Sequence, residues 1–166
     1  MRYSRFEELP VWKAAIELAI HTYHLTSRPR FKGHYGLRDQ LERAAVSVSN
    51  NIAEGFERGT TQELLTFLYI ARGSGGEVRS MLCLLEGLAT FDDLKFEISN
   101  LKLRAEGVSR QLRAWADSLQ NSDIRGQRYL TAKSRNKTNE AREREEFLDE
   151  LRKVREGSQA TGKTVE

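Results

Sequence analysis

Proline and cysteine are both scarce in this chain of 166 residues, which holds two prolines, Pro10 and Pro29, and one cysteine, Cys83. Because proline interrupts helices, its near absence leaves room for long ones. A single cysteine cannot form an internal disulfide, so nothing points to an oxidising compartment. Cys83 lies in an apolar stretch, and we expect it to be buried.

Long hydrophobic runs are also missing. No apolar stretch approaches the roughly 18 residues that suggest a transmembrane helix, and no apolar segment follows a basic start as in a secretory signal. We therefore expect no membrane contact and a cytoplasmic location.

Catalytic signatures are missing as well. No Ser or Cys stands in a recognisable nucleophile elbow, and Gly73, Gly75 and Gly76 lack the Lys-Ser/Thr ending of a phosphate-binding loop. His21 and His24 are three residues apart, but no acid or cysteine near them completes a metal site, so we expect solvated histidines. The sequence predicts a protein that is not an enzyme and has no metal or cofactor.

The net charge of +3 is unevenly distributed. Residues 1–124 hold 16 basic and 16 acidic side chains, whereas residues 125–166 hold 11 basic and 8 acidic ones. One segment contains five cations and no acid: Arg125, Arg128, Lys133, Arg135 and Lys137. This basic segment could bind nucleic-acid phosphates, with an affinity that falls as salt rises. A solvated linker is the alternative.

Four stretches carry apolar residues at helical spacing and predict helices at about 8–27, 37–55, 61–89 and 92–120. The first stripe is Trp12, Ile16, Ala19 and Tyr23; the second is Leu37, Leu41, Ala44, Val48 and Ile52; the third is Leu64, Phe67, Ala71, Ser74, Val78, Met81, Leu85 and Leu88; the fourth is Ile98, Leu101, Ala105, Val108, Leu112, Trp115 and Leu119. Amphipathic helices with short connections predict an all-α, up-down-up-down antiparallel four-helix bundle over residues 1–122.

The predicted helix ends have their own signals. Gly55 follows the last periodic residue of the second helix, where a C-terminal glycine is favoured. Thr60 and Glu63 fit a capping box at the start of the third helix, and Thr90 and Asp93 predict another before the fourth.

Beyond residue 122 the apolar periodicity ends. We predict a basic linker at 123–138, a charged C-terminal tail helix at 139–156 and a disordered tail at 157–166. The tail helix has only Phe147, Leu151 and Val154 on its apolar side. Because helix nucleation is costly, this segment either frays or docks on a partner.

Three blocks of the sequence carry a resemblance: FEELPVWKAAIELA (6–19), YGLRDQLERAAVSVSNNIAEGF (35–56) and ELLTFLYIARGSGGE (63–77). They are similar to the four-helix-bundle proteins first described as encoded within intervening sequences of bacterial 23S rRNA genes. The resemblance covers about the first 120 residues and implies a homo-oligomer, commonly a pentameric ring. A related protein, the accessory protein of diversity-generating retroelements, forms a basic pentameric barrel that engages a reverse transcriptase and nucleic acid.

The sequence departs from the family pattern at two places. Ser49 stands where the family often has proline, which puts a kink there in doubt. Gly75 and Gly76 stand where the family has larger residues, and inside a helix each glycine costs about 1 kcal/mol relative to alanine. We expect either an unusually close helix approach or a bend at these glycines.

Three polar residues beside the predicted seams are candidate site residues. Asn51 continues the apolar stripe of the second helix and needs a hydrogen-bond partner if it is buried. Glu54 can pair with Arg43 or Arg58 near the turn, and Arg72 lies beside the seam of the third helix. Structural pairing is the first interpretation, and a polar ligand site built from Asn51, Glu54 and Arg72 is the alternative.

Two function hypotheses follow from these features. The first is a non-enzymatic, homo-oligomeric scaffold that binds structured RNA or DNA, or a nucleic-acid enzyme. The alternative is a protein-interaction adaptor or accessory subunit, for example of a reverse transcriptase, that docks through residues 139–156.

Overall fold

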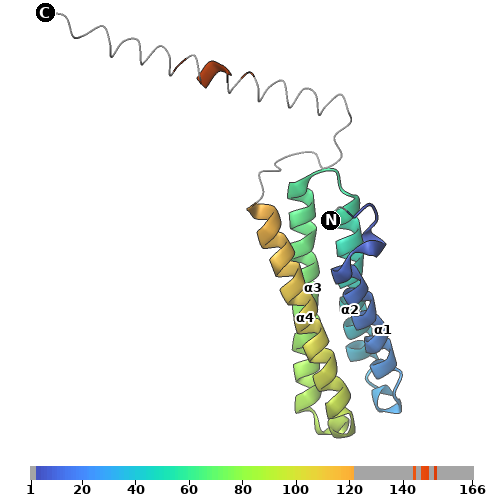
Figure 1. The fold of residues 1–166 in the computed structure, drawn as a ribbon. Coiled ribbons are helices and arrows are strands. Elements are labelled where there is room, and N and C mark those ends of the chain that lie inside the picture. The colour runs from blue at the N-terminus through green and yellow to red at the C-terminus, as the bar shows by residue number, and fades with distance from the viewer. Residues whose placement is uncertain (1–2, 122–143, 145–146, 150–151, 153–166) are drawn as a thin grey trace, which may run out of the picture. The chain divides into compact units, whose positions relative to one another are not determined.

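The computed structural model describes residues 3–121, 144, 147–149 and 152. It divides the chain into two units, residues 1–128 and 129–166. Four long helices form the first unit: α1 (Pro10–Thr26), α2 (Tyr35–Glu57), α3 (Thr61–Gly87) and α4 (Lys95–Gln120) (Figure 1). Three short 3-10 helices, η1 (Phe6–Glu8), η2 (Pro29–Phe31) and η3 (Ala89–Leu94), precede or connect them. The described residues contain no strand, so the all-α prediction is confirmed for them.

Each long helix packs against its neighbours in the chain, and α1 also packs against α4. Cross-helix bonds show that α3 and α4 run in opposite directions. Glu86, near the end of α3, accepts a hydrogen bond from Lys102 at 2.6 Å, and Tyr69, near the start of α3, accepts one from Gln120 at 2.7 Å. None of the helices that the structure describes is long and apolar enough to cross a membrane.

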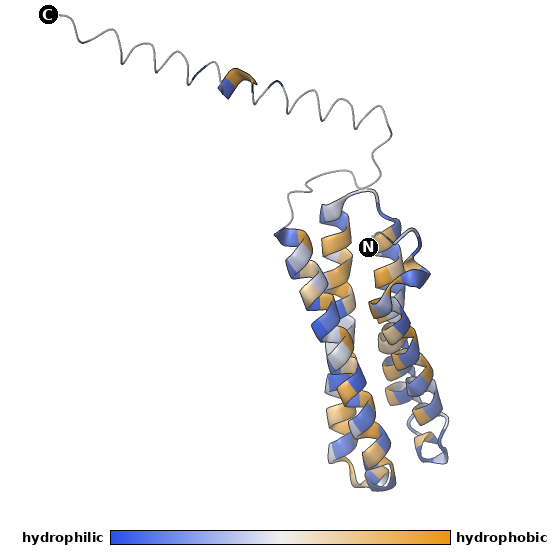
Figure 2. Ribbon diagram, viewed as in Figure 1, coloured by the Kyte–Doolittle hydropathy of each residue, from blue (hydrophilic) through white to orange (hydrophobic). Residues whose placement is uncertain are grey.

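The core is one cluster of buried apolar side chains contributed by all four helices. Figure 2 shows hydrophobic residues recurring along these helices, with hydrophilic residues between them. Most residues of the stripes predicted for α2, α3 and α4 belong to this core; Leu41, Leu64 and Leu112 are completely buried. The hydrophobic effect of closing these stripes on one another is therefore the main force that holds the first unit together.

α1 buries a different stripe from the predicted one. Its buried side consists of Val11, Ala15, Leu18, Ala19, Thr22, Leu25 and Thr26. Trp12 and Ile16 are only partly buried and Tyr23 is 46% exposed. The prediction of which side of α1 faces the core was therefore wrong. The physical reason is that α1 is apolar around most of its circumference, and periodicity alone does not decide which side faces the core.

Two local predictions on α3 and α4 were also wrong. Cys83 is exposed rather than buried, because its neighbours Met81, Leu82 and Leu85 already occupy the buried side of α3. The capping box at Thr90 and Asp93 does not form: η3 occupies this stretch, and α4 begins at Lys95 without a side-chain cap. Asp93 instead pairs with Arg30 at 2.9 Å.

The connection between α2 and α3 has half of the predicted capping box: the Thr60 hydroxyl caps α3, and the Glu63 carboxylate binds that hydroxyl rather than a backbone N–H. The Thr60 hydroxyl accepts a hydrogen bond from the Glu63 backbone N–H at 3.2 Å and donates one to the Glu63 carboxylate at 2.8 Å. These bonds satisfy an otherwise unpaired donor of the first turn and fix where α3 begins.

Gly55 does not end α2, which continues to Glu57, so its predicted role as a C-terminal glycine was wrong. A Cβ atom at Gly55 would lie 2.6 Å from the Cβ of Phe67 and 3.2 Å from a methyl carbon of Leu64. Gly55 is therefore the residue that allows α2 and α3 to approach each other closely.

The glycines in the middle of α3, Gly73, Gly75 and Gly76, do not have this role. A Cβ atom at Gly73, Gly75 or Gly76 would meet nothing within 4 Å, and α3 runs as one helix from Thr61 to Gly87. The expected close helix approach at Gly75 and Gly76 is absent from the described part of the chain.

We predict that Gly55→Ala and Gly73→Ala have opposite effects on stability. Gly55→Ala should lower the free energy of unfolding by about 1–3 kcal/mol, because the added methyl group overpacks the α2–α3 contact. Gly73→Ala, the matched control, should raise it by about 0.5–1 kcal/mol, because alanine is the better helix former. Urea unfolding followed by circular dichroism measures both, and equal effects of the two substitutions would contradict the close approach at Gly55.

Candidate functional site

The basic segment lies outside the described residues. Its five cations, Arg125, Arg128, Lys133, Arg135 and Lys137, therefore have no structural account, and their contact with phosphates stays a prediction. The same holds for the linker at 123–138 and the tail at 157–166, beyond the residues that the structure describes.

The second unit is described at Arg144, at residues 147–149 and at Arg152, and all of these are helical. Phe147 and Leu148 are 60% and 50% exposed. Arg152 lies 3.5 Å from the carboxylate of Asp149. The extent of the charged helix over 139–156 stays a prediction.

Asn51 belongs to a chain of hydrogen bonds that links α2 to α3. Its amide donates to the Ser47 backbone carbonyl at 2.7 Å and to the Ser47 hydroxyl at 3.0 Å. The Ser47 and Ser74 hydroxyls are 2.9 Å apart, and the Ser74 hydroxyl also donates to the Ile70 carbonyl at 3.2 Å. Asn51 thus has the partners that a partly buried polar group needs, and they are structural.

Glu54 and Arg72 do not join Asn51 in one site. Glu54 pairs with Arg58, whose guanidinium also lies 5.0 Å from the centre of the Phe67 ring. No hydrogen bond or ion pair connects Arg72 to Asn51 or Glu54 within the described residues. The structure therefore does not assemble these three residues into a ligand site.

Most cations of the first unit are already paired with an acid, for example Arg43 with Asp39 and Arg110 with Glu106. The hydrogen bond to Glu86 raises the pKa of Lys102 above its ordinary value of 10.5. Because the pKa is raised by folding, the contribution of this pair is complete at neutral pH and is lost only as the pH rises through the raised value. The surface of the described helices is thus nearly neutral and largely self-paired.

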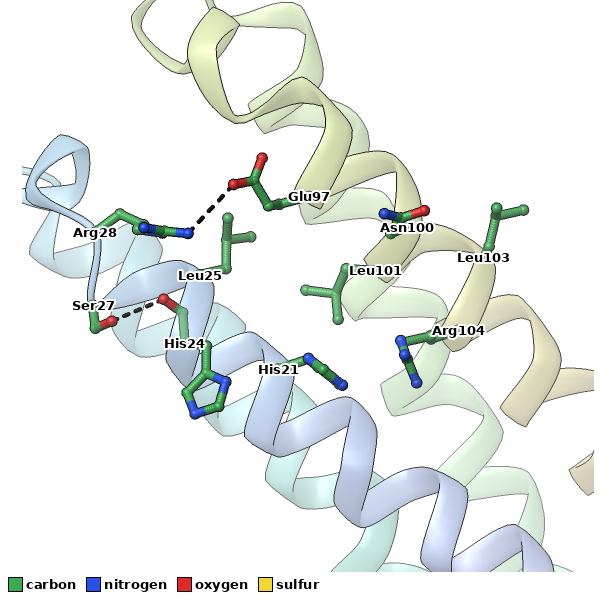
Figure 3. A pocket seen from close by; sticks show the side chains of 10 residues that line it. All are labelled: His21, His24, Leu25, Ser27, Arg28, Glu97, Asn100, Leu101, Leu103 and Arg104. Carbon is green, nitrogen blue, oxygen red and sulfur yellow. Dashed lines mark hydrogen bonds and ion pairs between the residues drawn. The ribbon is translucent and has the colours of Figure 1, made fainter.

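A groove with a volume of about 810 Å³ lies between α1 and α4. Leu25 and Leu101 form its apolar floor, and His21, Arg28 and Arg104 line it. The close-up shows His21 of α1 and Arg104 of α4 pointing toward each other across this α1–α4 groove (Figure 3). Grooves of this size match small-molecule sites.

Two ion pairs cross the α1–α4 groove. Arg28 lies 3.4 Å from Glu97, and Arg104 lies 3.4 Å from Glu17. All four side chains are between 40% and 64% exposed. Exposed pairs of this kind contribute about 0–1 kcal/mol, so a better anion can compete for either arginine.

Sequence reasoning missed the α1–α4 groove, although it singled out His21 and His24. The two rings lie edge to face with centroids 6.1 Å apart, and both line the groove. No group of three or more His, Cys, Asp or Glu side chains suited to a metal occurs within the residues that the structure describes. Nothing in the sequence signalled Arg104, which lies 83 positions further along the chain than His21 and lines the same groove only after folding.

Comparison with known proteins gives one clear result. A family model described as 23S rRNA-intervening sequence protein matches residues 7–114, which is more than half of the chain. A search of curated proteins found no match. The matched residues include α1, α2, α3 and most of α4, and they end before the basic segment. The chain is therefore a member of the 23S rRNA-intervening sequence protein family.

Proposed function

We propose that this protein is a non-enzymatic, homo-oligomeric scaffold of the cytoplasm that binds structured RNA or DNA, or an enzyme acting on nucleic acid. The observation that carries the proposal is the family match over residues 7–114, since the family takes its name from sequences within rRNA genes. The helices provide the scaffold, arranged as an up-down-up-down antiparallel bundle, and the basic segment provides the phosphate contacts.

The distribution of charge supports this division of roles. Cations of the described helices are mostly held in ion pairs, whereas Arg125, Arg128, Lys133, Arg135 and Lys137 have no acid among them in the sequence. Unpaired cations release more counterions from a nucleic acid than paired ones do, and this release drives binding. Copies of the basic segment around a ring, for example a pentamer, would act together on one polyanion.

Exposed apolar side chains support the homo-oligomer. Phe96 of α4 is 78% exposed, and Leu84 and Ile70 of α3 are 53% and 46% exposed. Large exposed apolar residues that share neighbouring helices are typical of interaction surfaces. A second copy of the chain would remove them from water.

We predict that nucleic-acid binding depends on the basic segment and on salt. Mobility-shift titrations with a structured RNA should show affinity that falls linearly on a log–log plot as salt rises. Replacing Arg125, Arg128, Lys133, Arg135 and Lys137 by glutamine should remove most of the slope of log affinity against log salt concentration. The control replaces five exposed cations of the helical unit, Arg5, Lys13, Arg43, Arg110 and Arg113, and should leave the slope nearly unchanged. An unchanged slope in the first variant, or no binding of the native chain at low salt, would contradict the proposal.

Light scattering of the same protein tests assembly. A homo-oligomer should give a mass that is a multiple of 19.0 kDa, and five times this value for a pentamer. A mass of 19.0 kDa at micromolar concentration would exclude the ring.

The alternative function is an adaptor or accessory subunit, for example of a reverse transcriptase. The exposure of Phe147 and Leu148 favours it, because an apolar edge on a charged helix is suited to docking. Pull-down of a candidate partner with the full chain and with a chain ending at residue 138 discriminates the two functions. If the protein docks through residues 139–156, the shorter chain should lose the partner. If the protein is a scaffold that does not need these residues, the shorter chain should keep the partner.

A further inference from the structure

We propose that the α1–α4 groove binds a phosphate group, carried either by a free nucleotide or by a nucleic-acid strand. Three side chains with nitrogen donors line it: His21 from α1, and Arg104 and Asn100 from α4. Donors from two helices on either side of one groove can share the oxygens of a single phosphate, and a guanidinium matches phosphate geometry well.

The volume and the apolar floor of the groove favour a ligand larger than a phosphate ion. Leu25 and Leu101 are 4% and 3% exposed and form the floor, while Leu103 at the rim is 62% exposed. A volume of about 810 Å³ exceeds what an inorganic phosphate needs. A sugar and a base attached to the phosphate would fill the remaining volume and cover the leucines, so a nucleotide unit fits better than a bare ion.

The charged groups around His21 come from both sides of the groove. Glu17 and His24 lie on α1, Arg28 follows the end of α1, and Glu97 and Arg104 lie on α4. The two arginines and the two glutamates cancel in formal charge, and a phosphate would compete with the glutamates for the exposed arginines.

Histidine-ring NMR of the full chain tests the proposal, because the chain has only three histidines. The third, His34, packs against Phe91 with tilted rings whose centroids are 5.4 Å apart, and it serves as an internal control. Uridine 5′-monophosphate and an eight-residue oligouridine are the two probes, and uridine is the control without phosphate. We expect saturable shifts of the His21 signal, smaller shifts of His24, no shift of His34, and no response to uridine.

Two variants separate the groove from general electrostatics. Arg104→Gln should weaken nucleotide binding by at least about tenfold, the usual effect of losing a charged hydrogen bond. Arg113→Gln removes another α4 arginine, which is 67% exposed and pairs with Asp117 outside the groove, and this variant should bind as the native chain does. Thermal melting establishes that both variants are folded. Equal weakening in both would overturn the proposal.

The two probes distinguish the sources of the phosphate. Shifts of His21 with the mononucleotide support a free nucleotide, and shifts with the oligonucleotide alone support a strand. Only the strand rests on the function proposed above. If the oligonucleotide binds in a mobility-shift assay while His21 does not respond, the groove proposal is overturned and the nucleic-acid scaffold is not. If neither probe moves the His21 signal, the groove is not a phosphate site.

Discussion

The contact between α2 and α3 is the interaction on which the rest of the described structure depends. Gly55 removes the side chain that would otherwise meet Phe67, so the two helices come close at the end of α2. Further along, the Ser47 and Ser74 hydroxyls join them at 2.9 Å. A close contact fixes the rotation of each helix, and this rotation decides which residues of α1 and α4 find a buried partner.

The opposite side of the unit is built differently. α1 and α4 are joined across an open groove by two exposed ion pairs at 3.4 Å rather than by interdigitated glycine and serine contacts. Exposed pairs of this kind add little stability. This side is also where polar and basic side chains from both helices meet over an apolar floor. This side of the unit therefore has room for a ligand.

Much of the fold could be predicted from the sequence because α2, α3 and α4 carry clear apolar stripes. Leu41, Val78 and Leu112 were expected in the core and are buried there. The stripe of α1 was misplaced because α1 offers more than one apolar side, and only the positions of α2 and α4 select one. The role of Gly55 was misinterpreted because a glycine near a predicted helix end can either end the helix or allow a neighbouring helix to come close. Only the position of Phe67 in the folded protein shows that the second role applies.

The candidate site was less predictable than the fold. His21 and Arg104 are 83 positions apart in the sequence, and neither belongs to a motif. Asn51 was predictable as a polar residue on a seam, but its partners Ser47 and Ser74 depend on the rotation of two helices. Family membership could be inferred from three sequence blocks, since these blocks combine core positions with fixed spacing.

Native-state hydrogen exchange tests the central role of the α2–α3 contact most directly. Amide hydrogens in the most stable part of a protein exchange with solvent only when the whole protein unfolds. The account predicts that amides of residues 45–52 and 64–78 exchange most slowly, and that those of α1 open earlier with a smaller free energy. Slowest exchange in α1 and α4, with α2 and α3 opening first, would contradict it.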